Sequence, residues 1–360
     1  MGDPEDSGLA QIKSGKRQQL AHAAYRLGLM PVLRWLRSWK GAEIRVLAYH
    51  RVLADSQWQD FAFDPDLVSA SASAFREQMA FVRTRMQPLR FAELLGYLDR
   101  GEALPPNAVI VTFDDGYDDN YRVAFPILRE LGVPATFFVS TGHIDNGLPY
   151  VYDWLVHMIC QTRATRLELP ELDLHIDLPD ALAARRKIAA DVLDRIKWLD
   201  DAIQHAVVAH LEQAWSMPRT PHPDSRPMSW AQLREMQAGG MEIGSHGTFH
   251  RMLALLPRAQ MHEEIETSRT AIARELGAAP QVLSYPVGGP NAYDDEVIAT
   301  AQRAGFRIGC TYICGSNRWP LDHAFTLRRL PVERDMSQAW FAGMISWPEL
   351  FSYPTRLRIG

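Results

Sequence analysis

The sequence contains little cysteine and no long apolar run. Only three cysteines occur among the 360 residues, at Cys160, Cys310 and Cys314, and none of them forms a CxxC pair. This spacing argues against a disulfide framework and against a cysteine-ligated zinc site. No apolar stretch reaches the ~18 residues that a membrane-spanning helix needs. The sequence therefore predicts an ordinary globular protein, long enough for one large α/β domain or two smaller ones.

A secretory signal is also lacking. Residues 1–13 are acidic and have no apolar core, and Asp6 stands where a myristoylation signal has serine or threonine. The formal net charge of −5 is small, so the total charge does not call for a nucleic-acid partner. We therefore expect a cytoplasmic protein that does not bind nucleic acid.

Acidic residues are absent from residues 13–40, where seven lysines or arginines occur. The apolar residues of this segment recur at helical spacing, at Leu29, Val32, Leu33, Leu36 and Trp39, with Pro31 between them. For residues 1–40 we expect a disordered start over residues 1–17 and then a basic amphipathic helix. This helix could lie peripherally on an anionic inner-membrane surface, or it could pack on the protein's own body and bury Trp35 and Trp39.

Strand-like and helix-like segments alternate over most of the chain, which is typical of a parallel sheet or barrel. Strands are predicted at 43–52, 104–116, 133–141, 241–246, 281–289, 306–313 and 325–332. Helices are predicted at 71–85, 120–132, 229–240, 257–277 and 293–305. Residues 150–228 break the alternation with a helical pattern that ends in a proline-rich stretch. We expect one domain over residues 41–335 with a helical insertion at 150–228, and a C-terminal tail at 336–360.

Two adjacent carboxylates follow the strand-like segment AVIVTF. Successive strand residues point to opposite faces, so Asp114 and Asp115 can have different roles. His246 and His250 are four residues apart, just past another predicted strand, and this spacing can bring two imidazoles to one metal ion. Taken alone, this spacing is a weak signal, and two surface or capping histidines are the more common case. Because functional groups gather at the carboxyl ends of parallel strands, we expect all four side chains in one crevice.

These motifs together resemble one known family. TFDDGY, followed by ATFFV, SHGTFH and YPVG, is similar to the polysaccharide deacetylase family (carbohydrate esterase family 4, NodB-like) over residues 43–335. The resemblance implies an α/β fold, an irregular (β/α)7 barrel. It implies a divalent metal ion, usually zinc, bound by Asp115, His246 and His250. Asp114 then matches the catalytic base, and the backbone N–H of Val287 matches an oxyanion donor.

Two elements of the family's site do not stand at their usual positions in this sequence. They are the histidine that acts as general acid and the arginine that orients the catalytic base. No clear leucine-rich histidine motif follows residue 320, but LAYHRV resembles rearranged members that act on poly-N-acetylglucosamine and implies His50 as the acid. The alternatives are a core role for His50, or His323 as the acid. Ser284 stands where the family commonly has an arginine that orients the base. Arg329 could replace it or could lie on the outer face of its strand.

The implied activity is metal-dependent removal of N-acetyl groups from an N-acetylated sugar. The substrate partner would be a bacterial polysaccharide or a lipid-linked glycan precursor. Tyr117, Tyr285 and Trp230 could stack on sugar rings, although aromatic side chains also commonly pack in cores. Two other functions stay open at this point, an O-acetyl esterase acting on carbohydrate and a catalytically inactive carbohydrate-binding protein.

The two further carboxylates of the acidic stretch, Asp118 and Asp119, fit residues at the start of a helix.

Overall fold

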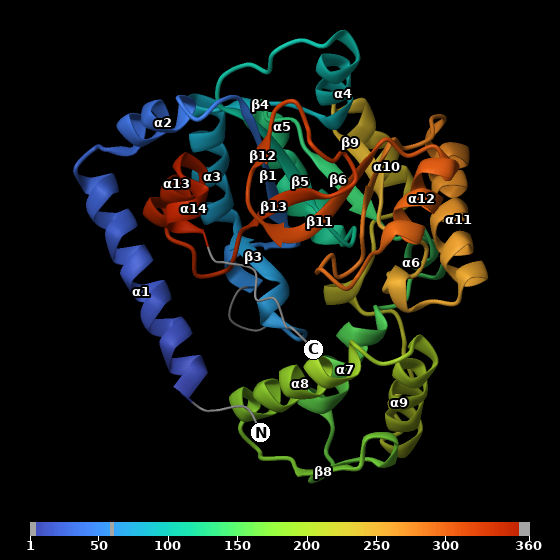
Figure 1. The fold of residues 1–360 in the computed structure, drawn as a ribbon. Helices are drawn as coiled ribbons and strands as arrows, with labels where there is room; N and C mark the ends of the chain where they lie inside the picture. The colour runs from blue at the N-terminus through green and yellow to red at the C-terminus, as the bar shows by residue number, and fades with distance from the viewer. Residues whose placement is uncertain (1–4, 58–60, 353–360) are drawn as a thin grey trace.

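A closed barrel of seven parallel strands lies at the centre of the computed structural model, which describes residues 5–57 and 61–352 (Figure 1). The strands are β1 (Glu43–Tyr49), β5 (Ala108–Phe113), β6 (Thr136–Val139), β9 (Glu242–Ser245), β10 (Val282–Ser284), β11 (Ile308–Cys314) and β13 (Leu327–Pro331). Their order around the barrel is β1-β13-β11-β10-β9-β6-β5, and β5 pairs with β1 to close it. The predicted (β/α)7 barrel is confirmed.

Short strands make the barrel irregular. β4 (Gln87–Pro88) extends the sheet beside β5, and β12 (Asn317–Arg318) pairs antiparallel with β1. The predicted strand 43–52 is interrupted at His50, after which β2 (Arg51–Leu53) leaves the barrel and pairs with β3 (Val68–Ser71). β9 and β10 are joined through one register pair, Leu283 with Ser245. This weak seam lies between the two strands that lead to His246 and to the YPVG segment.

The hydrophobic pattern of β5 explains why it forms a central strand. All six of its residues are buried, as expected for a parallel strand covered on both faces. Val109, Val111 and Phe113 join one hydrophobic cluster, whereas Ala108 and Ile110 join another. This alternation follows from the period of two along a strand. Packing on both faces therefore fixes the position of β5 up to its last residue, Phe113. Asp114 and Asp115 follow directly.

Helices surround the barrel. They are α3 (Ala72–Arg85), α4 (Phe91–Arg100), α5 (Phe125–Leu131), α6 (Thr141–Asn146), α10 (Trp230–Ala238), α11 (Arg258–Leu276) and α12 (Asp295–Ala304). Ser229 and Gln232 form a capping box at the start of α10, and α5 ends at Gly132 with a positive φ of 64°. A π-helical segment at Asn120–Ala124 precedes α5. The sequence pattern did not predict α4 or α6.

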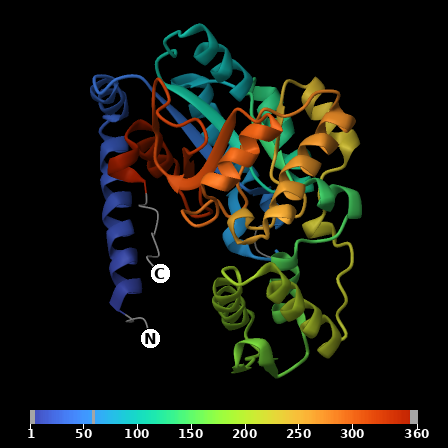
Figure 2. The same cartoon turned by 45° about the vertical axis from the view of Figure 1, so that its right-hand side comes forward.

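Residues 150–228 form a lobe beside the barrel, as Figures 1 and 2 show. The lobe contains α7 (Val151–Gln161), α8 (Leu182–Ile196) and α9 (Asp201–Ala214). It also contains an antiparallel pair, β7 (Arg166–Leu169) with β8 (Leu174–Asp177), which the expected all-helical insertion did not include. Trp154, Leu167 and Leu211 of the lobe are buried in one hydrophobic cluster, which also includes Leu53 and Val68 of β2 and β3. The insertion therefore packs against the segment that follows β1.

The two ends of the chain differ from expectation. Residues 1–4 and 353–360 lie outside the described residues. The chain is helical from Glu5 onward, in α1 (Glu5–Arg26) and α2 (Met30–Ser38), so the predicted disordered start is wrong there. The predicted C-terminal tail is also wrong, because α13 (Gln338–Ser346) and α14 (Pro348–Phe351) contribute to the core. Among the described residues, no helix has the length and apolar character needed to cross a membrane.

The burial of α13 has a simple physical cause. Its central sequence AWFAGMI is apolar all round, and such a helix is stable only when it is covered on every side. α1, α2 and α3 provide this cover. The ring of Phe341 is fully buried and meets the ring of Phe81 edge to face, with centroids 6.1 Å apart. Residues 338–351 are therefore part of the folded domain.

We predict that Phe341→Ala lowers the free energy of unfolding by about 3 to 4 kcal/mol, because the change leaves a cavity in the core. Leu350→Ala is the matched control, since Leu350 is exposed, and it should change stability by about 0.5 kcal/mol or less. Urea denaturation of the two variants and the wild type measures both effects. Equal stability of all three proteins would show that α13 is not part of the core.

Candidate active site

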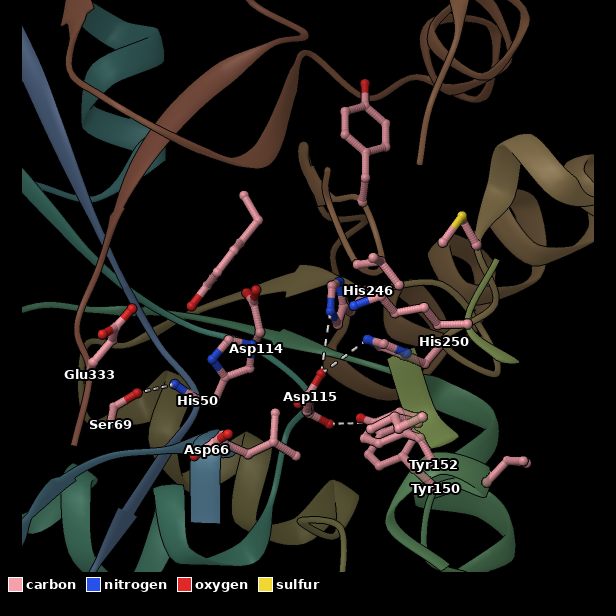
Figure 3. Close-up of a pocket in the computed structure, with 18 of the residues that line it drawn as sticks. His50, Asp66, Ser69, Asp114, Asp115, Tyr150, Tyr152, His246, His250 and Glu333 are labelled. Atoms are coloured by element: carbon pink, nitrogen blue, oxygen red, sulfur yellow. Dashed lines mark hydrogen bonds and ion pairs between the residues drawn. The ribbon is translucent and has the colours of Figure 1, made fainter. Parts of the chain in front are cut away.

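A cavity of about 810 Å³ opens at the carboxyl ends of the barrel strands. Asp114 and Asp115 follow β5, His246 follows β9, and His50 follows β1. The cavity is also bounded by the insertion lobe, through Leu193, Ile196, Lys197, Asp201, Gln204 and His205. The predicted site residues Asp114, Asp115, His246, His250 and His50 all line it, as do Tyr285 and Val287. The structure thus brings the separate sequence motifs to one place (Figure 3).

Asp115, His246 and His250 present three potential ligand atoms to one another. Asp115 Oδ1 lies 3.4 Å from His246 Nε2 and 3.3 Å from His250 Nε2. The ligand atoms of the three side chains all lie within 4.8 Å of one another (Figure 3). Asp115 and His246 are buried, and His250 is close to buried. This is a compact facial set of one carboxylate and two imidazoles.

The chemistry of these three atoms fits a bound cation. Nδ1 of His246 is 2.8 Å from the carbonyl oxygen of Ser284, which can only accept, so Nδ1 carries a proton. A neutral His246 then points the lone pair of Nε2 at Asp115. Asp115 Oδ1 is buried and has no hydrogen-bond partner among the described residues. When both histidines are neutral, their Nε2 lone pairs and Asp115 Oδ1 converge, and this is the donor set of a divalent metal ion.

The electrostatics agree with an ionised Asp115. Burial by itself would raise the pKa of this carboxyl group, but the neighbouring His246 and His250 hold its pKa well below the usual range. Burial lowers the pKa of His250, which favours the neutral imidazole that metal binding requires. The site is therefore prepared to offer a carboxylate and an unprotonated imidazole at neutral pH.

Unusual backbone conformations aim the ligands. Asp115 has a φ of 71° and His250 a φ of 58°, values that residues other than glycine rarely adopt and that cost about 1 kcal/mol or more each. The hydroxyl of Tyr150 donates to the carbonyl oxygen of Asp115. The carboxylate of Glu264 accepts hydrogen bonds from the N–H groups of Thr248 (2.8 Å) and Phe249 (2.9 Å). Neighbouring side chains thus hold both strained segments in place.

Sequence reasoning missed Glu264 and Tyr150. Glu264 lies in the middle of α11, where a glutamate is an ordinary helix residue, and Tyr150 begins the insertion. No local pattern distinguishes either residue from its neighbours. Only the fold reveals that Glu264 caps the His246–His250 loop and that Tyr150 faces Asp115.

Arg329 holds Asp114 through both carboxylate oxygens. Its Nη1 lies 2.8 Å from Asp114 Oδ1 and its Nη2 lies 2.7 Å from Oδ2, and both side chains are buried. The same guanidinium donates to the carbonyl oxygen of Thr311 at 2.7 Å and to the hydroxyl of Ser284 at 3.0 Å. Of the two positions considered for Arg329, the structure shows the inner one. It approaches Asp114 from β13, while Ser284 occupies the position of the usual family arginine.

This ion pair sets the charge of Asp114. Burial alone would raise the pKa of the carboxyl group, but the charge of Arg329, with that of His246, lowers the pKa below its usual value. Asp114 is therefore ionised at neutral pH. Because both of its oxygens accept from one rigid guanidinium, its orientation is fixed as well.

His50 lies close to Asp114, and Figure 3 shows its imidazole next to that carboxylate. Its backbone N–H donates to the hydroxyl of Ser69 at 2.9 Å, and its carbonyl oxygen accepts from the side chain of Asn120 at 2.8 Å. These two bonds fix the backbone at the point where the chain leaves β1, while the imidazole lines the cavity. His323, the alternative acid, is exposed and is not among the described residues that line the cavity.

Val287 lies in the cavity wall with a φ of 64°, which is strained for a β-branched residue. Gly288 follows with a φ of 61°, and a Cβ atom at Gly288 would lie 2.6 Å from the backbone nitrogen of Tyr312. The close approach to β11 therefore requires glycine at this position. The turn holds the backbone of Val287 at the cavity, where the resemblance placed an oxyanion donor.

The aromatic residues expected to contact sugar are mostly occupied elsewhere. Tyr117 is buried, donates to Asp153 at 2.9 Å, and is not among the described residues that line the cavity. Tyr285 lines the cavity, but its hydroxyl donates to a backbone carbonyl, that of Phe325, at 3.0 Å. Trp230 donates to Asp145 and lies away from the cavity. Other aromatic rings that line it are those of Tyr150, Tyr152, Phe249, Tyr312 and Trp340.

Asp118 and Asp119 begin a helical segment, as expected, but the side chain of Asp119 does not cap it, and both carboxylates form ion pairs. Asp119 is buried in a pair with Arg51, whose Nη2 lies 2.7 Å from its Oδ2. Asp118 pairs with Arg122 and with Arg226, both at 2.6 Å. Since Arg226 belongs to the end of the insertion, these carboxylates join the lobe to the barrel beside the site.

Comparison with known proteins gives the same fold. The chain is 21% identical to the Bacillus subtilis protein YxkH over 315 residues, which cover 86% of this chain and 79% of YxkH. It is 37% identical to the poly-beta-1,6-N-acetyl-D-glucosamine N-deacetylase of Escherichia coli K12 over 89 residues, 24% of this chain and 13% of that enzyme. The Streptococcus pyogenes deacetylase PplD has a similar structure, with a TM-score of 0.56, 17% identity, and coverage of 87% of this chain and 99% of PplD.

A family model described as polysaccharide deacetylase matches residues 101–309, more than half of the chain. The matched segment contains Asp114, Asp115, His246, His250 and Val287. It ends before Arg329 and begins after His50, so these two residues rest on the geometry described above. The chain belongs to the polysaccharide deacetylase family.

Proposed function

We propose that this protein is a metal-dependent deacetylase that removes N-acetyl groups from a glycan containing N-acetylglucosamine. The observation that carries the proposal is the position of the Arg329-bound carboxylate of Asp114 beside the convergent Asp115, His246 and His250. Such a site combines a fixed base with three metal ligands. Relatives named as poly-beta-1,6-N-acetyl-D-glucosamine N-deacetylases support the choice of sugar.

The metal ion, which we propose to be zinc, would be held by Asp115, His246 and His250, and when bound would supply Lewis acidity and lower the pKa of water. Asp114 would accept the proton of the attacking water. Arg329 keeps Asp114 ionised and directed, which leaves the remaining lone pairs of the carboxylate for that proton. Arg329 is a positioning residue because it contacts the base and not the substrate.

The remaining steps fall to His50 and Val287. Amide cleavage leaves an amine that must be protonated as it departs, and His50 is the candidate donor because its imidazole shares the cavity with Asp114. The backbone N–H of Val287 would stabilise the oxyanion that forms on the acetyl carbonyl oxygen. Because backbone contacts fix the chain at His50 and at Val287, these two residues need little movement during the reaction.

The shape of the cavity supports a glycan substrate. Its volume of about 810 Å³ exceeds the space that one N-acetyl sugar would fill, and the lobe adds the polar groups of Lys197, Asp201, Gln204 and His205 to the wall. Such groups can hydrogen-bond sugar hydroxyls. We therefore propose an oligosaccharide segment as the substrate, taken either from a polysaccharide or from a lipid-linked precursor.

Acetate release from N-acetylglucosamine oligomers tests the proposal, with O-acetylated sugars as the comparison. We predict that removing the metal with a chelator abolishes release and that zinc restores it. Release from the O-acetylated sugars alone would identify an esterase, and no release from either, in metal-loaded protein, would contradict a deacetylase function.

We predict that Asp115→Ala and His246→Ala lose the metal, whereas Asp114→Asn keeps the metal and loses turnover. Elemental analysis of the purified variants measures metal content, and acetate release measures turnover. Equal metal content in all variants would overturn the ligand assignment.

We predict that His50→Ala lowers kcat by roughly 10²- to 10⁴-fold, the usual contribution of a positioned acid or base. Metal content should stay unchanged, because His50 is not one of the converging ligands. His323→Ala is the matched control and should keep normal turnover. The assignment of the acid is wrong if the His323 variant is the impaired one.

We predict that Arg329→Met lowers the free energy of unfolding by about 3 kcal/mol, because it leaves the buried carboxylate of Asp114 unpaired. The double variant Asp114→Asn with Arg329→Met should be more stable than Arg329→Met alone, since no unpaired charge remains. Arg329→Lys should keep metal and lower kcat, because an ammonium group cannot hold both carboxylate oxygens. Additive stability changes in the double variant would show that the two side chains are not coupled.

A further inference from the structure

Many of the exposed large apolar side chains belong to the N-terminal helices. Most of the exposed large apolar residues of the described chain lie between residues 20 and 39, on the end of α1 and on α2. They are Leu20, Tyr25, Leu27, Leu29, Val32, Trp35, Leu36 and Trp39, which we call the N-terminal apolar surface. Trp39 is 71% exposed, Trp35 is 55% exposed, and their rings meet with centroids 4.5 Å apart. Exposed patches of this kind mark interaction sites.

α2 is turned opposite to an ordinary surface helix. Its apolar residues Val32, Trp35, Leu36 and Trp39 lie at the i, i+3, i+4 and i+7 positions of one face, and that face is exposed. Its arginines point inward instead. Nη1 of Arg34 lies 3.1 Å from the hydroxyl of Ser346, and Nη2 of Arg37 lies 2.7 Å from Glu43 Oε2. The arginines of α2 therefore fix the helix to the rest of the protein, and its apolar face is exposed to solvent.

The two interpretations of this segment can now be compared with the structure. The helices do pack on the protein's own body, because Ala21, Ala24 and Met30 are buried. However, this packing does not bury Trp35 and Trp39, as the self-packed alternative required. The N-terminal helices therefore pack on the folded domain, and Trp35 and Trp39 are nevertheless exposed.

All the charged side chains within residues 13–40 are basic, but two carboxylates from elsewhere in the chain, Glu43 and Glu349, pair with Arg37. No aspartate or glutamate occurs in residues 13–40, and Lys16, Arg26 and Lys40 are exposed at its margins. Arg34 and Arg37 are engaged within the protein, so fewer cations are available than the sequence suggested. Attraction to an anionic surface would be a minor contribution, and apolar burial would be the main one.

We propose that the N-terminal apolar surface binds the surface of a lipid bilayer, with Trp35 and Trp39 inserted at the level of the headgroups. Paired tryptophans on the exposed face of a helix, in a segment whose own charged residues are all basic, match the chemistry of the interface between headgroups and acyl chains. The helix would lie on the bilayer without crossing it. This inference is independent of the proposed reaction, because none of these residues lines the cavity.

Trp39 and the metal ligands lie at opposite ends of β1, whereas α1 extends toward the cavity, which Gln18 lines. Trp39 precedes the amino end of β1 by a few residues, whereas His50, Asp115 and the other site residues follow the carboxyl ends of their strands. The seven residues of β1 correspond to about 20 Å. Figures 1 and 2 likewise show α2 and the insertion lobe at opposite ends of the molecule. A docked protein would therefore reach glycan that extends beyond its lipid attachment.

Co-sedimentation with phosphatidylcholine vesicles, with and without phosphatidylglycerol, tests the proposal on the full chain. The test variant is Trp35→Glu with Trp39→Glu, which changes two exposed side chains. The matched control is Leu182→Glu with Ile203→Glu, two exposed apolar residues on the insertion lobe. We expect the wild type and the control to bind both kinds of vesicle, and the tryptophan variant to bind at least about tenfold more weakly. Binding should persist at high salt because most of it is apolar.

The acetate-release assay on soluble oligomers keeps the two proposals separate. The tryptophan variant should retain wild-type turnover there, which shows that it is folded and that the barrel is intact. Equal vesicle binding by the wild type and the tryptophan variant would overturn the proposal. So would a wild-type dimer in lipid-free solution that the tryptophan substitutions convert to monomer, because a second copy would then cover the surface. Light scattering after size-exclusion chromatography measures the oligomeric state of the wild type and of the tryptophan variant.

Discussion

The buried pair of Arg329 and Asp114 is the contact on which the arrangement of the site depends. The guanidinium reaches from β13 to the tip of β5, and it also bonds to Thr311 on β11 and to Ser284 on β10. One side chain thus joins four strands at the carboxyl end of the barrel. Burial of such a charge is costly unless every polar group is paired, and here the carboxylate, a carbonyl and a hydroxyl satisfy it. With Asp114 committed to Arg329, the strained turn at Asp115 directs the second carboxylate to the histidines.

The motifs around the site could be predicted because each is local. Asp114 and Asp115 follow a continuous apolar strand, His246 and His250 are four residues apart, and both motifs lie where parallel strands end. The partner of Asp114 could not be predicted, because it depends on the register of one strand. Arg328 and Arg329 are neighbours on β13, and one is exposed while the other is fully buried. A shift of one residue would exchange them.

Other features escaped prediction because they depend on contacts far apart in the sequence. Tyr117 lies only two residues from Asp115, yet its ring turns toward Asp153 of the insertion and under the guanidinium of Arg51, 4.1 Å away. α13 follows the last barrel strand, and only the cover that α1, α2 and α3 provide makes it part of the core. The exposed tryptophans of α2 show the reverse case. The helical pattern was correct, but the pattern could not show which face points outward.

The proposed reaction and the proposed lipid contact use opposite ends of the barrel. At the carboxyl ends, long-range hydrogen bonds from Tyr150 and to Glu264 hold the strained backbone at Asp115 and beside His250. At the amino end of β1, α2 is fixed through Arg34 and Arg37 while its apolar face stays outside. β1 connects the two ends and is buried along almost its whole length. The proposed lipid contact and the proposed reaction therefore use different residues, joined by a buried strand.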